Sequence, residues 1–242
     1  MSLQITLENS LMAKTFKQGD CSQCRKRVEE FKVLRDEDFK LIEDNRFEIL
    51  YHAGETIFKQ GTSFTHIICI LDGLVKVYLE SGDKKNFIFS VLGPGDMVIN
   101  PGMFTLDMQQ FTVVALEDTV ACHIEKQVME EIIRTNNLFA IEMLKRANMR
   151  NKAYFRKFLT LTRKQMPGRV AEVILYLYKS VYKTNPYTLT VTRQEMADMA
   201  AITKESTIRV LKDFKDAGLI ALNGNDLRIL NEKALMNIST NG

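Results

Sequence analysis

Four cysteines, at positions 21, 24, 69 and 122, have the widest range of chemistry in this 242-residue sequence. Only two residues separate Cys21 from Cys24, and thiolates at such a spacing can hold an iron–sulfur cluster or act as a dithiol switch. A solvent-exposed pair with no such role is the alternative. Four cysteines are too few for a disulfide scaffold in a chain of this length. We expect Cys69, which lies in a predicted strand, to be a buried apolar residue.

The sequence lacks the residue patterns of common enzymes. It has three histidines, His52, His66 and His123, and no His-x-His pair of the kind that a cupin-like metal oxygenase needs. No Gly-x-Ser-x-Gly, P-loop or zinc-protease motif occurs. We therefore predict that the chain is not an enzyme. Each histidine is interpreted as structural, with an axial haem ligand as the alternative.

Charged residues are unevenly distributed, although the net charge is only +3. Residues 145–169 contain nine lysines or arginines and no acidic residue. This run is either a solvated helix face or a surface that attracts a phosphate backbone.

A second charged group lies in an expected helix over residues 203–215. Apolar positions can bury one side of this helix and leave Lys204, Glu205, Arg209 and Lys212 on the other. An arginine can donate to O6 and N7 of guanine in the major groove, and a glutamate can accept from the cytosine amino group. A surface ion pair between Glu205 and Arg209 is the alternative.

The elements that would position these residues begin with a β-rich region, in a composition (45% hydrophobic, 26% charged) typical of globular domains. Short helices are expected over residues 28–45. Seven short runs, separated by glycines, then predict strands at 48–51, 56–58, 66–71, 74–79, 87–92, 111–115 and 120–124. Evenly spaced strands with glycine turns indicate an antiparallel roll or barrel.

A long helix follows the strands. Its expected seam advances by three and four residues in turn, through Leu144, Ala147, Asn151, Tyr154, Phe158 and Leu161. This spacing is that of a two-stranded coiled coil, in which a buried Asn sets register and oligomeric state. The seam predicts a homodimer; a helix that packs on its own β-domain is the alternative.

A proline and a glycine, Pro167-Gly168, then end the long helix and form a predicted hinge. An amphipathic helix is expected over 169–182, a short strand over 190–192, and a helix over 193–200 that Thr192 and Glu195 cap. The helix from Thr203 follows after a short turn. Two strands around Asn-Gly-Asn at 223–225 complete a winged helix-turn-helix.

These segments resemble the CRP/FNR family of bacterial regulators. Residues 191–212 (VTRQEMADMAAITKESTIRVLK) are similar to its helix-turn-helix, 53–61 (AGETIFKQG) and 71–78 (LDGLVKVY) to its cyclic-nucleotide-binding β-roll, and 167–171 (PGRVA) to its hinge. The resemblance implies an α+β chain with an N-terminal segment at 1–46, a β-roll sensor at 47–127, a dimerisation helix region at 128–166 and a winged helix-turn-helix at 167–242.

The resemblance also assigns candidate contacts to DNA. Glu205 and Arg209 occupy the positions that read bases, and Lys204 is adjacent to them. The predicted DNA-binding set is Thr203, Lys204, Glu205, Arg209, Arg193 and Lys212. One departure is Ala201, where a glycine is usual in the turn, and alanine is expected to strain it slightly.

Two further departures concern the sensor. Members that bind cAMP have a Gly-Glu pair and an Arg-Ser pair, where this chain has Ile99-Asn100 and Gln110-Phe111. Without the arginine, the cyclic phosphate would be buried unpaired, so cAMP is an improbable ligand. Tyr154 and Phe155 also replace the small hydroxyl residues that contact adenine.

Cys21, Cys24 and Cys122 match three of the four cluster ligands of oxygen-sensing members. The fourth thiol is missing; Glu30 could supply a carboxylate in its place, although oxygen ligation of a cluster is unusual. An iron–sulfur cluster, haem or another small ligand all remain open as the signal.

The predicted partners are double-stranded operator DNA, a second copy of the chain and, for an activator, RNA polymerase. The sequence has no membrane-length apolar run and no signal-peptide core near its start, so a cytoplasmic location is expected. The alternative function is a ligand- or redox-sensing module that acts through protein contacts.

Overall fold

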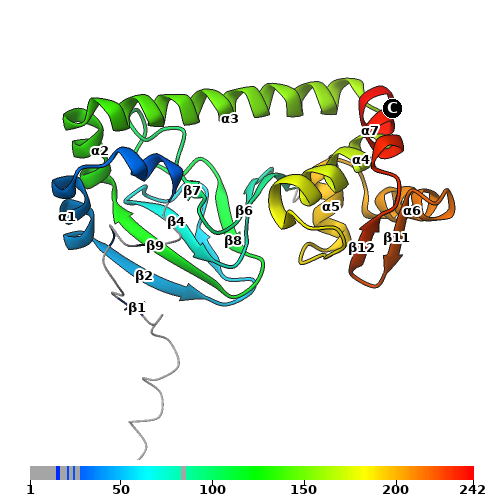
Figure 1. The fold of residues 1–242 in the computed structure, drawn as a ribbon, viewed down its shortest axis with the longest axis horizontal. Helices are drawn as coiled ribbons and strands as arrows, with labels where there is room; N and C mark the ends of the chain where they lie inside the picture. The colour runs from blue at the N-terminus through cyan, green and yellow to red at the C-terminus, as the bar shows by residue number, and fades with distance from the viewer. Residues whose placement is uncertain (1–14, 17–20, 22–23, 25–27, 83–85) are drawn as a thin grey trace, which may run out of the picture. The chain divides into compact units, whose positions relative to one another are not determined.

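A computed structural model describes the chain except for residues 1–14, 17–20, 22–23, 25–27 and 83–85 (Figure 1). The chain divides into two compact units, one of residues 1–75 and 92–143 and the other of residues 76–91 and 144–242. Within the described residues, no helix combines the length and apolar character that a membrane span requires.

The first unit is built on antiparallel strands, as predicted. Its five-stranded sheet has the order β1 (Thr15–Phe16), β2 (Arg46–Tyr51), β9 (Thr119–Glu125), β4 (His66–Asp72) and β7 (Met97–Val98). Strand β3 (Thr56–Phe58) pairs with β8 (Thr112–Ala115). The strands β1 and β7 were not predicted, because two residues are too few to show an alternating pattern.

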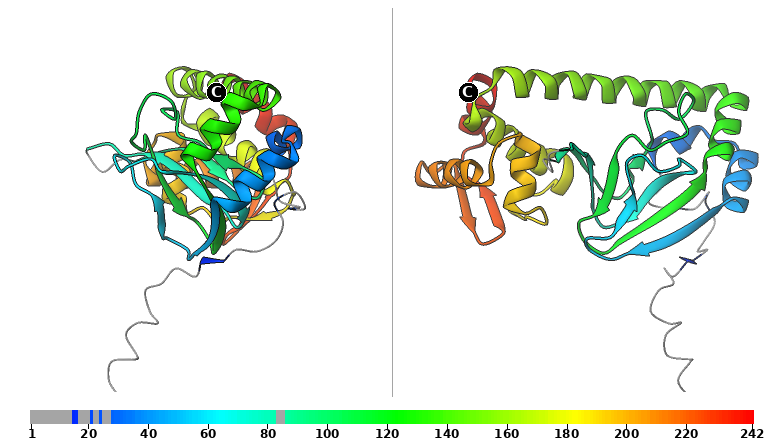
Figure 2. Two further views of the ribbon diagram at one scale, coloured as in Figure 1. Left: turned by 90° about the vertical axis from the view of Figure 1, so that its left-hand side faces the viewer. Right: turned by 180° about the vertical axis from the view of Figure 1, so that it is seen from behind.

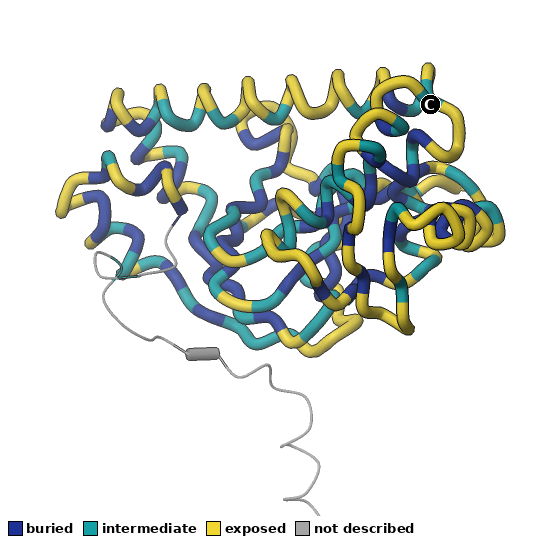
Figure 3. Tube along the Cα trace, turned by 45° about the vertical axis from the view of Figure 1, so that its right-hand side comes forward, coloured by how far each residue is buried: buried dark blue, intermediate teal, exposed yellow. Residues whose placement is uncertain are grey.

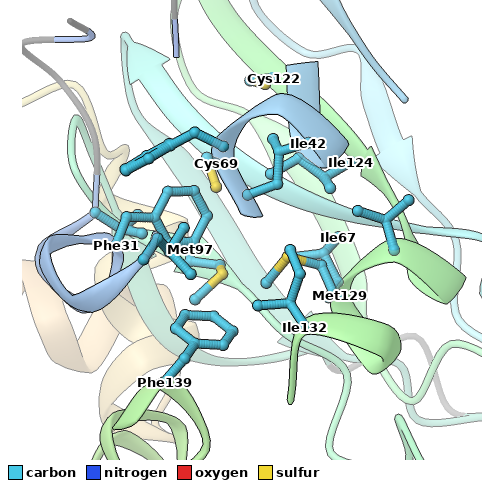
Figure 4. Close-up of a cluster of buried hydrophobic side chains, with 14 of the residues drawn as sticks. Phe31, Ile42, Ile67, Cys69, Met97, Cys122, Ile124, Met129, Ile132 and Phe139 are labelled. Atoms are coloured by element: carbon cyan, nitrogen blue, oxygen red, sulfur yellow. The ribbon is translucent and has the colours of Figure 1, made fainter. Parts of the chain in front are cut away.

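Strand register sorts the side chains of the sheet into two faces. Cys69 lies opposite Cys122, and His123 lies between Phe47 and Ile68 on the neighbouring strands. Since alternate residues point to opposite faces, Cys69 and Cys122 share one face and His123 lies on the other. The face with the cysteines carries a hydrophobic core in which Cys69 is 4% exposed, which confirms its predicted burial (Figure 4).

Three helical segments cover this core (Figure 2). They are the 3-10 helix Glu29–Val33, α1 (Asp36–Asp44) and α2 (Lys126–Thr135). The short helices expected over 28–45 are confirmed. They contribute Phe31, Phe39 and Ile42 to the same core as the sheet, so this part of the expected N-terminal segment packs as part of the β-domain.

The expected dimerisation region contains two helices, α2 and α3 (Asn137–Arg163). Asn136 separates them: its Oδ1 accepts a hydrogen bond from Phe139 N (3.1 Å), and its Nδ2 donates to Asp38 Oδ2 (2.8 Å). An asparagine in this position caps a helix start, so α3 begins about nine residues later than the region boundary at 128. Exposed residues recur along the whole of α3 (Figure 3).

The second unit contains most of β5 (Val75–Leu79) and of β6 (Phe87–Leu92), together with α3 from residue 144 onward. It also contains the winged helix-turn-helix. The latter consists of α4 (Met166–Tyr176), a π-helical extension Leu177–Tyr182, β10 (Tyr187–Thr188), α5 (Arg193–Ala200), α6 (Lys204–Asp216), β11 (Ile220–Asn223), β12 (Asp226–Ile229) and α7 (Glu232–Asn241). The strands form a sheet in the order β10-β12-β11. The expected strand at 190–192 is wrong by a few residues, and α7 was not predicted.

The break at Pro167-Gly168 is confirmed as the start of a new helix. Pro167 lies in the first turn of α4, where its missing N–H has no helical partner to lose. Gly168 is buried, and a Cβ there would approach the carbonyl oxygen of Gly242 to 2.5 Å. Packing therefore requires glycine at this position, and the hinge role stays a prediction.

Candidate nucleic-acid interface and sensor site

Capping interactions fix the two helices of the helix-turn-helix. Thr192 Oγ1 accepts from Glu195 N (3.2 Å), and Glu195 Oε2 accepts from Thr192 N (2.7 Å), which confirms the predicted capping box. Thr203 Oγ1 accepts from Ser206 N (3.2 Å) at the start of α6. Between the helices, Ala201 has φ 51° and ψ 49°, the left-handed conformation that favours glycine, so the predicted strain in the turn has a physical basis.

Helix α6 has one buried and one exposed side. Thr207, Val210, Leu211 and Phe214 are buried against the rest of the domain. The opposite side exposes Lys204, Glu205, Ile208, Arg209 and Lys212. The sequence therefore assigned both sides of this helix correctly, because a buried stripe at helical spacing is visible in the residues themselves.

Glu205 and Arg209 do not form the ion pair considered as the alternative. Within the described part of the chain, Glu205 has no basic group within salt-bridge distance, and Arg209 donates a long hydrogen bond to Ser206 Oγ (3.4 Å). Both charged groups remain available to an external partner on the same exposed face.

Arg193 is placed differently from the other predicted DNA contacts. Its guanidinium donates to the carbonyl oxygen of Gly224 (2.6 Å) at the tip of the β11–β12 hairpin, and burial lowers the pKa of Arg193. Lys215 makes a similar bond to Leu222 O (3.0 Å). These two side chains hold the wing against α5 and α6. Sequence reasoning missed this role because it depends on the folded-back position of the hairpin.

The candidate sulfur site has a cation at its centre. The Arg46 guanidinium, 3% exposed, forms a buried ion pair with Glu48 (2.5 Å) and reaches Cys122 Sγ (3.9 Å). Arg46 also interacts with Cys21, whose thiol packs beside the hydrophobic core. Burial raises the pKa of Cys122 to about 12 and raises that of Cys21, with Arg46 acting in the opposite direction on both.

This arrangement does not fit an iron–sulfur cluster. Cluster ligands are thiolates that surround the metal. Here Cys24 lies next to Cys21, but both Cys21 and Cys122 interact with the Arg46 guanidinium, a cation that is already paired with Glu48 and that would compete with a metal for the thiolates. In the described ranges of the chain, no three side chains of the metal-ligating types gather at one point. Glu30, the candidate fourth ligand, is buried in the 3-10 helix.

Neutral amides occupy the part of the β-domain where the resemblance would place the residues that hold a cyclic phosphate. Asn100 is 2% exposed, donates to Met108 O (2.6 Å) and accepts from Gly102 N (3.3 Å). Gln110 also donates to Met108 O (3.1 Å). Gln109 is equally buried, and neither of its side-chain polar atoms has a partner within the described structure. Among the described residues, none of these amides is hydrogen-bonded to a cationic side chain.

Comparison with known proteins identifies the two parts. A model of the cyclic nucleotide-binding domain matches residues 48–136, and a model of the Crp-like helix-turn-helix domain matches residues 168–238. The chain belongs to the CRP/FNR family of transcription regulators. It is a DNA-binding transcription regulator and not an enzyme, as the sequence predicted.

Relatives of this CRP/FNR regulator carry different names. The transcriptional activator protein FnrA of Stutzerimonas stutzeri is 24% identical over 186 residues, 75% of this chain and 76% of FnrA. A Mycobacterium tuberculosis relative, named as a CRP-like cAMP-activated global regulator, is 22% identical over 75% of this chain and 83% of its own. FixK2 of Bradyrhizobium japonicum has a similar fold, with TM-score 0.73, 20% identity and coverage of 79% of this chain and 96% of FixK2.

The predicted seam of the CRP/FNR regulator lies only partly on the exposed side of α3. Leu144, Ala147, Asn151 and Phe158 are exposed, but Leu161 is half-buried and the Tyr154 ring contacts Phe89 (centroids 5.8 Å apart). A second series with the same spacing is exposed more consistently. It runs through Ile141, Leu144, Asn148, Asn151, Phe155, Phe158 and Thr162, and we call it the α3 stripe.

The histidines of this CRP/FNR regulator have packing roles, with His52 exposed. His123 is 4% exposed, stacks on Phe47 (centroids 5.0 Å) and lies 3.0 Å from the Tyr51 hydroxyl through Nε2. His66 contacts both Phe47 and His123 edge-on. Burial lowers the pKa of His123 to about 4, so the ring is neutral near pH 7. These contacts favour the structural interpretation over an axial haem ligand.

Proposed function

We propose that two copies of the regulator pair through the α3 stripe and read a palindromic operator with their two α6 helices. Family regulators act as dimers, and the half-sites of such an operator are about one helical turn, roughly 34 Å, apart. The observation that carries this proposal is the exposed face of α6, where Lys204, Glu205 and Arg209 are free of competing ion pairs in the described chain.

The residues of this face have distinct roles in the proposal. Arg209 donates to a guanine and Glu205 accepts from a cytosine in the same major groove, because four residues place both on one side of the helix. Lys204 and Lys212 contact phosphates, which adds affinity without sequence preference. Thr203 caps the helix end that approaches the DNA. Arg193 positions the wing through Gly224 instead of reading bases.

The signal in this proposal is not cAMP. A buried cyclic phosphate requires a cation, and the buried polar residues at the corresponding place are the uncharged Asn100 and Gln109, next to Gln110. The name of the Mycobacterium tuberculosis relative therefore does not transfer its ligand to this chain. A signal at the β-roll would bias the position of the DNA-binding domain, and an activator would also contact RNA polymerase.

Operator selection followed by binding measurements tests the DNA proposal. We expect Arg209→Ala to lose about 1 to 3 kcal/mol of operator affinity and to relax preference at one base pair of each half-site. Lys233→Ala, on the exposed surface of α7, is the matched control and should bind as wild type does. Unchanged affinity and selectivity of Arg209→Ala would show that α6 does not read bases in this way.

Iron and labile-sulfide analysis of anaerobically purified protein tests the sulfur site. We expect no stoichiometric iron or sulfide, because the Arg46 guanidinium interacts with both Cys21 and Cys122. Brown protein whose iron is lost in Cys122→Ser would show that the thiols rearrange around a cluster. A sharp Soret band would instead point to haem and would contradict the structural role of His66 and His123.

A further inference from the structure

A cavity of about 270 Å³ lies within the second unit, away from the exposed face of α6. Strand β6 and helices α3, α4 and α5 supply its walls. Ligand pockets typically begin near 300 Å³, so this cavity suits a compact molecule with one or two rings. None of the residues assigned above to base reading or to the sulfur site lines it.

Three aromatic rings form much of the apolar wall. Phe89 and Tyr154 meet edge to face, with centroids 5.8 Å apart and planes at 82°. The Tyr176 hydroxyl donates a hydrogen bond to the carbonyl oxygen of Val91 (2.9 Å) and accepts one from the Val91 N–H (3.0 Å). Its ring is therefore a fixed part of the lining. A flat aromatic ligand can pack edge-to-face or offset-stacked against such rings, and both arrangements are favourable.

Two cations line the same cavity. The Lys157 ammonium donates to Met199 O (2.6 Å) and lies 5.6 Å from the centroid of the Phe87 ring. An ammonium has three N–H donors, and within the described residues only Met199 accepts from this one at hydrogen-bond distance. Burial lowers the pKa of Lys157 to about 8, although the Glu172 carboxylate acts in the opposite direction. The second cation, Arg156, is exposed.

The acidic residue of the cavity, Glu172, forms its ion pair with Lys164 and only partly offsets the charge of Lys157. Glu172 Oε2 accepts from Lys164 Nζ (2.5 Å) and from Ser239 Oγ (2.9 Å). Its carboxylate is thus already paired with Lys164, which lies between α3 and α4, and also accepts from Ser239 in α7. Burial raises the pKa of Glu172, but Lys164 and Ser239, with a smaller effect of Lys157, lower it overall. A guest with one negative charge would satisfy Lys157 and Arg156.

We propose that this cavity binds a small aromatic carboxylate, with its ring between Phe89, Tyr154 and Tyr176 and its carboxylate on Lys157 and Arg156. A charge-assisted hydrogen bond to a desolvated ammonium is stronger than one in water, and stacking adds to it. The binding itself does not depend on DNA recognition. Because Met199 belongs to the first helix of the helix-turn-helix, a bound ligand would also touch the domain that carries α6.

Isothermal titration with benzoate and phenylacetate tests the site, with benzamide as the uncharged analogue and cyclohexanecarboxylate as the non-aromatic one. We expect saturable binding of the two aromatic carboxylates and at least tenfold weaker binding of both analogues. Lys157→Gln should weaken benzoate binding at least tenfold while it keeps a donor for Met199 O. Lys152→Gln, an exposed cation on the same helix, is the matched control and should not change the affinity.

A second variant separates the ring contacts from the charge. Tyr154→Ala should weaken the binding of both aromatic carboxylates. It should leave the circular dichroism spectrum unchanged, since Tyr154 is 39% exposed. The proposal is overturned if wild-type protein shows no saturable binding up to the solubility limit of the probes. It is also overturned if benzamide binds as tightly as benzoate, or if Lys157→Gln binds benzoate like wild type. Operator binding can fail or succeed independently of these results.

Discussion

The winged helix-turn-helix and the β-domain place their informative polar groups differently. In the former, Lys204, Glu205 and Arg209 point outward from a helix whose other side is buried. In the latter, Arg46 and Glu48 form a buried ion pair, and Asn100 and Gln109 lie almost fully inside. A surface that reads DNA must be exposed before its partner arrives, whereas the specificity of an internal site depends on which polar groups the fold brings together.

The difference also explains why the family relationship transfers unevenly between the two domains. The exposed face of α6 carries the residues that the resemblance assigns to base contacts, so the chemistry proposed for its output follows from a short segment. In the β-domain, Ile99-Asn100 and Gln110-Phe111 stand where the resemblance leads us to expect the residues that hold cAMP, and such departures change what can be held there. The predictions below test whether this division between an exposed reader and an internally specified sensor is correct.

The largest expected effect concerns the α3 stripe, through which we propose that two copies pair. Phe158→Glu would place a charge in the dimer interface, and we expect monomers in light scattering and at least ~100-fold weaker operator binding, because an unpaired buried charge costs several kcal/mol. Phe158 is 65% exposed in the single chain, so the variant should fold.

The matched control is Met149→Glu. Met149 is 64% exposed but lies nine residues away, about half a turn around the helix at roughly 100° per residue. The Met149→Glu variant should remain dimeric. Phe155→Glu and Tyr154→Glu distinguish the two seams: we expect dissociation from the former and a dimer from the latter. The opposite result would restore the seam through Tyr154 and Leu161.

The next effect tests the buried ion pair of the β-domain. Arg46→Met leaves Glu48 buried without its partner, and we expect a loss of about 3 to 5 kcal/mol in the free energy of unfolding by urea. The double variant Arg46→Met/Glu48→Leu should recover most of this loss, since neither charge then remains. A single variant as stable as wild type would mean that Glu48 finds water or another donor.

A pH titration of stability tests the buried histidine. The pKa of His123 is lowered from 6.5 to about 4, so the unfolded chain binds this proton at a higher pH than the folded chain does. The stability that the neutral His123 ring contributes is fully present above about pH 6.5 and is lost as the pH falls toward 4. The free energy of unfolding should fall by roughly 3 kcal/mol over this range, at 1.36 kcal/mol per pH unit. His123→Gln should flatten this dependence. His52→Gln, at an exposed position, should retain it.

The smallest effect is expected in the turn of the helix-turn-helix. Ala201→Gly removes the left-handed strain of an alanine, and we expect a gain of about 0.5 to 1 kcal/mol after the greater flexibility of glycine in the unfolded chain is subtracted. Ala200→Gly, one residue earlier inside α5, should lose about 1 kcal/mol or more. Equal effects at both positions would show that the strain at Ala201 is negligible.

Local patterns accounted for most of the fold. Seven strands and the helices of the helix-turn-helix were predicted at or near their observed positions, because alternation, helical spacing and capping residues such as Thr192 and Thr203 act over a few neighbours. The errors fall where tertiary contacts decide. Asn136 separates α2 from α3 through Asp38, and β7 exists only because β4 lies beside it.

The candidate sites divide in the same way. The sequence by itself determined the family, the exposed face of α6, the strained turn at Ala201 and the absence of a cationic partner for a cyclic phosphate, since each depends on residue type and short spacing. Only the tertiary structure decided that Arg46 interacts with Cys21 and Cys122, that Arg193 holds the wing, and that Lys157 lines a cavity with three aromatic rings. These residues are far apart in the chain, and their meeting depends on strand register and helix packing, which no local pattern specifies.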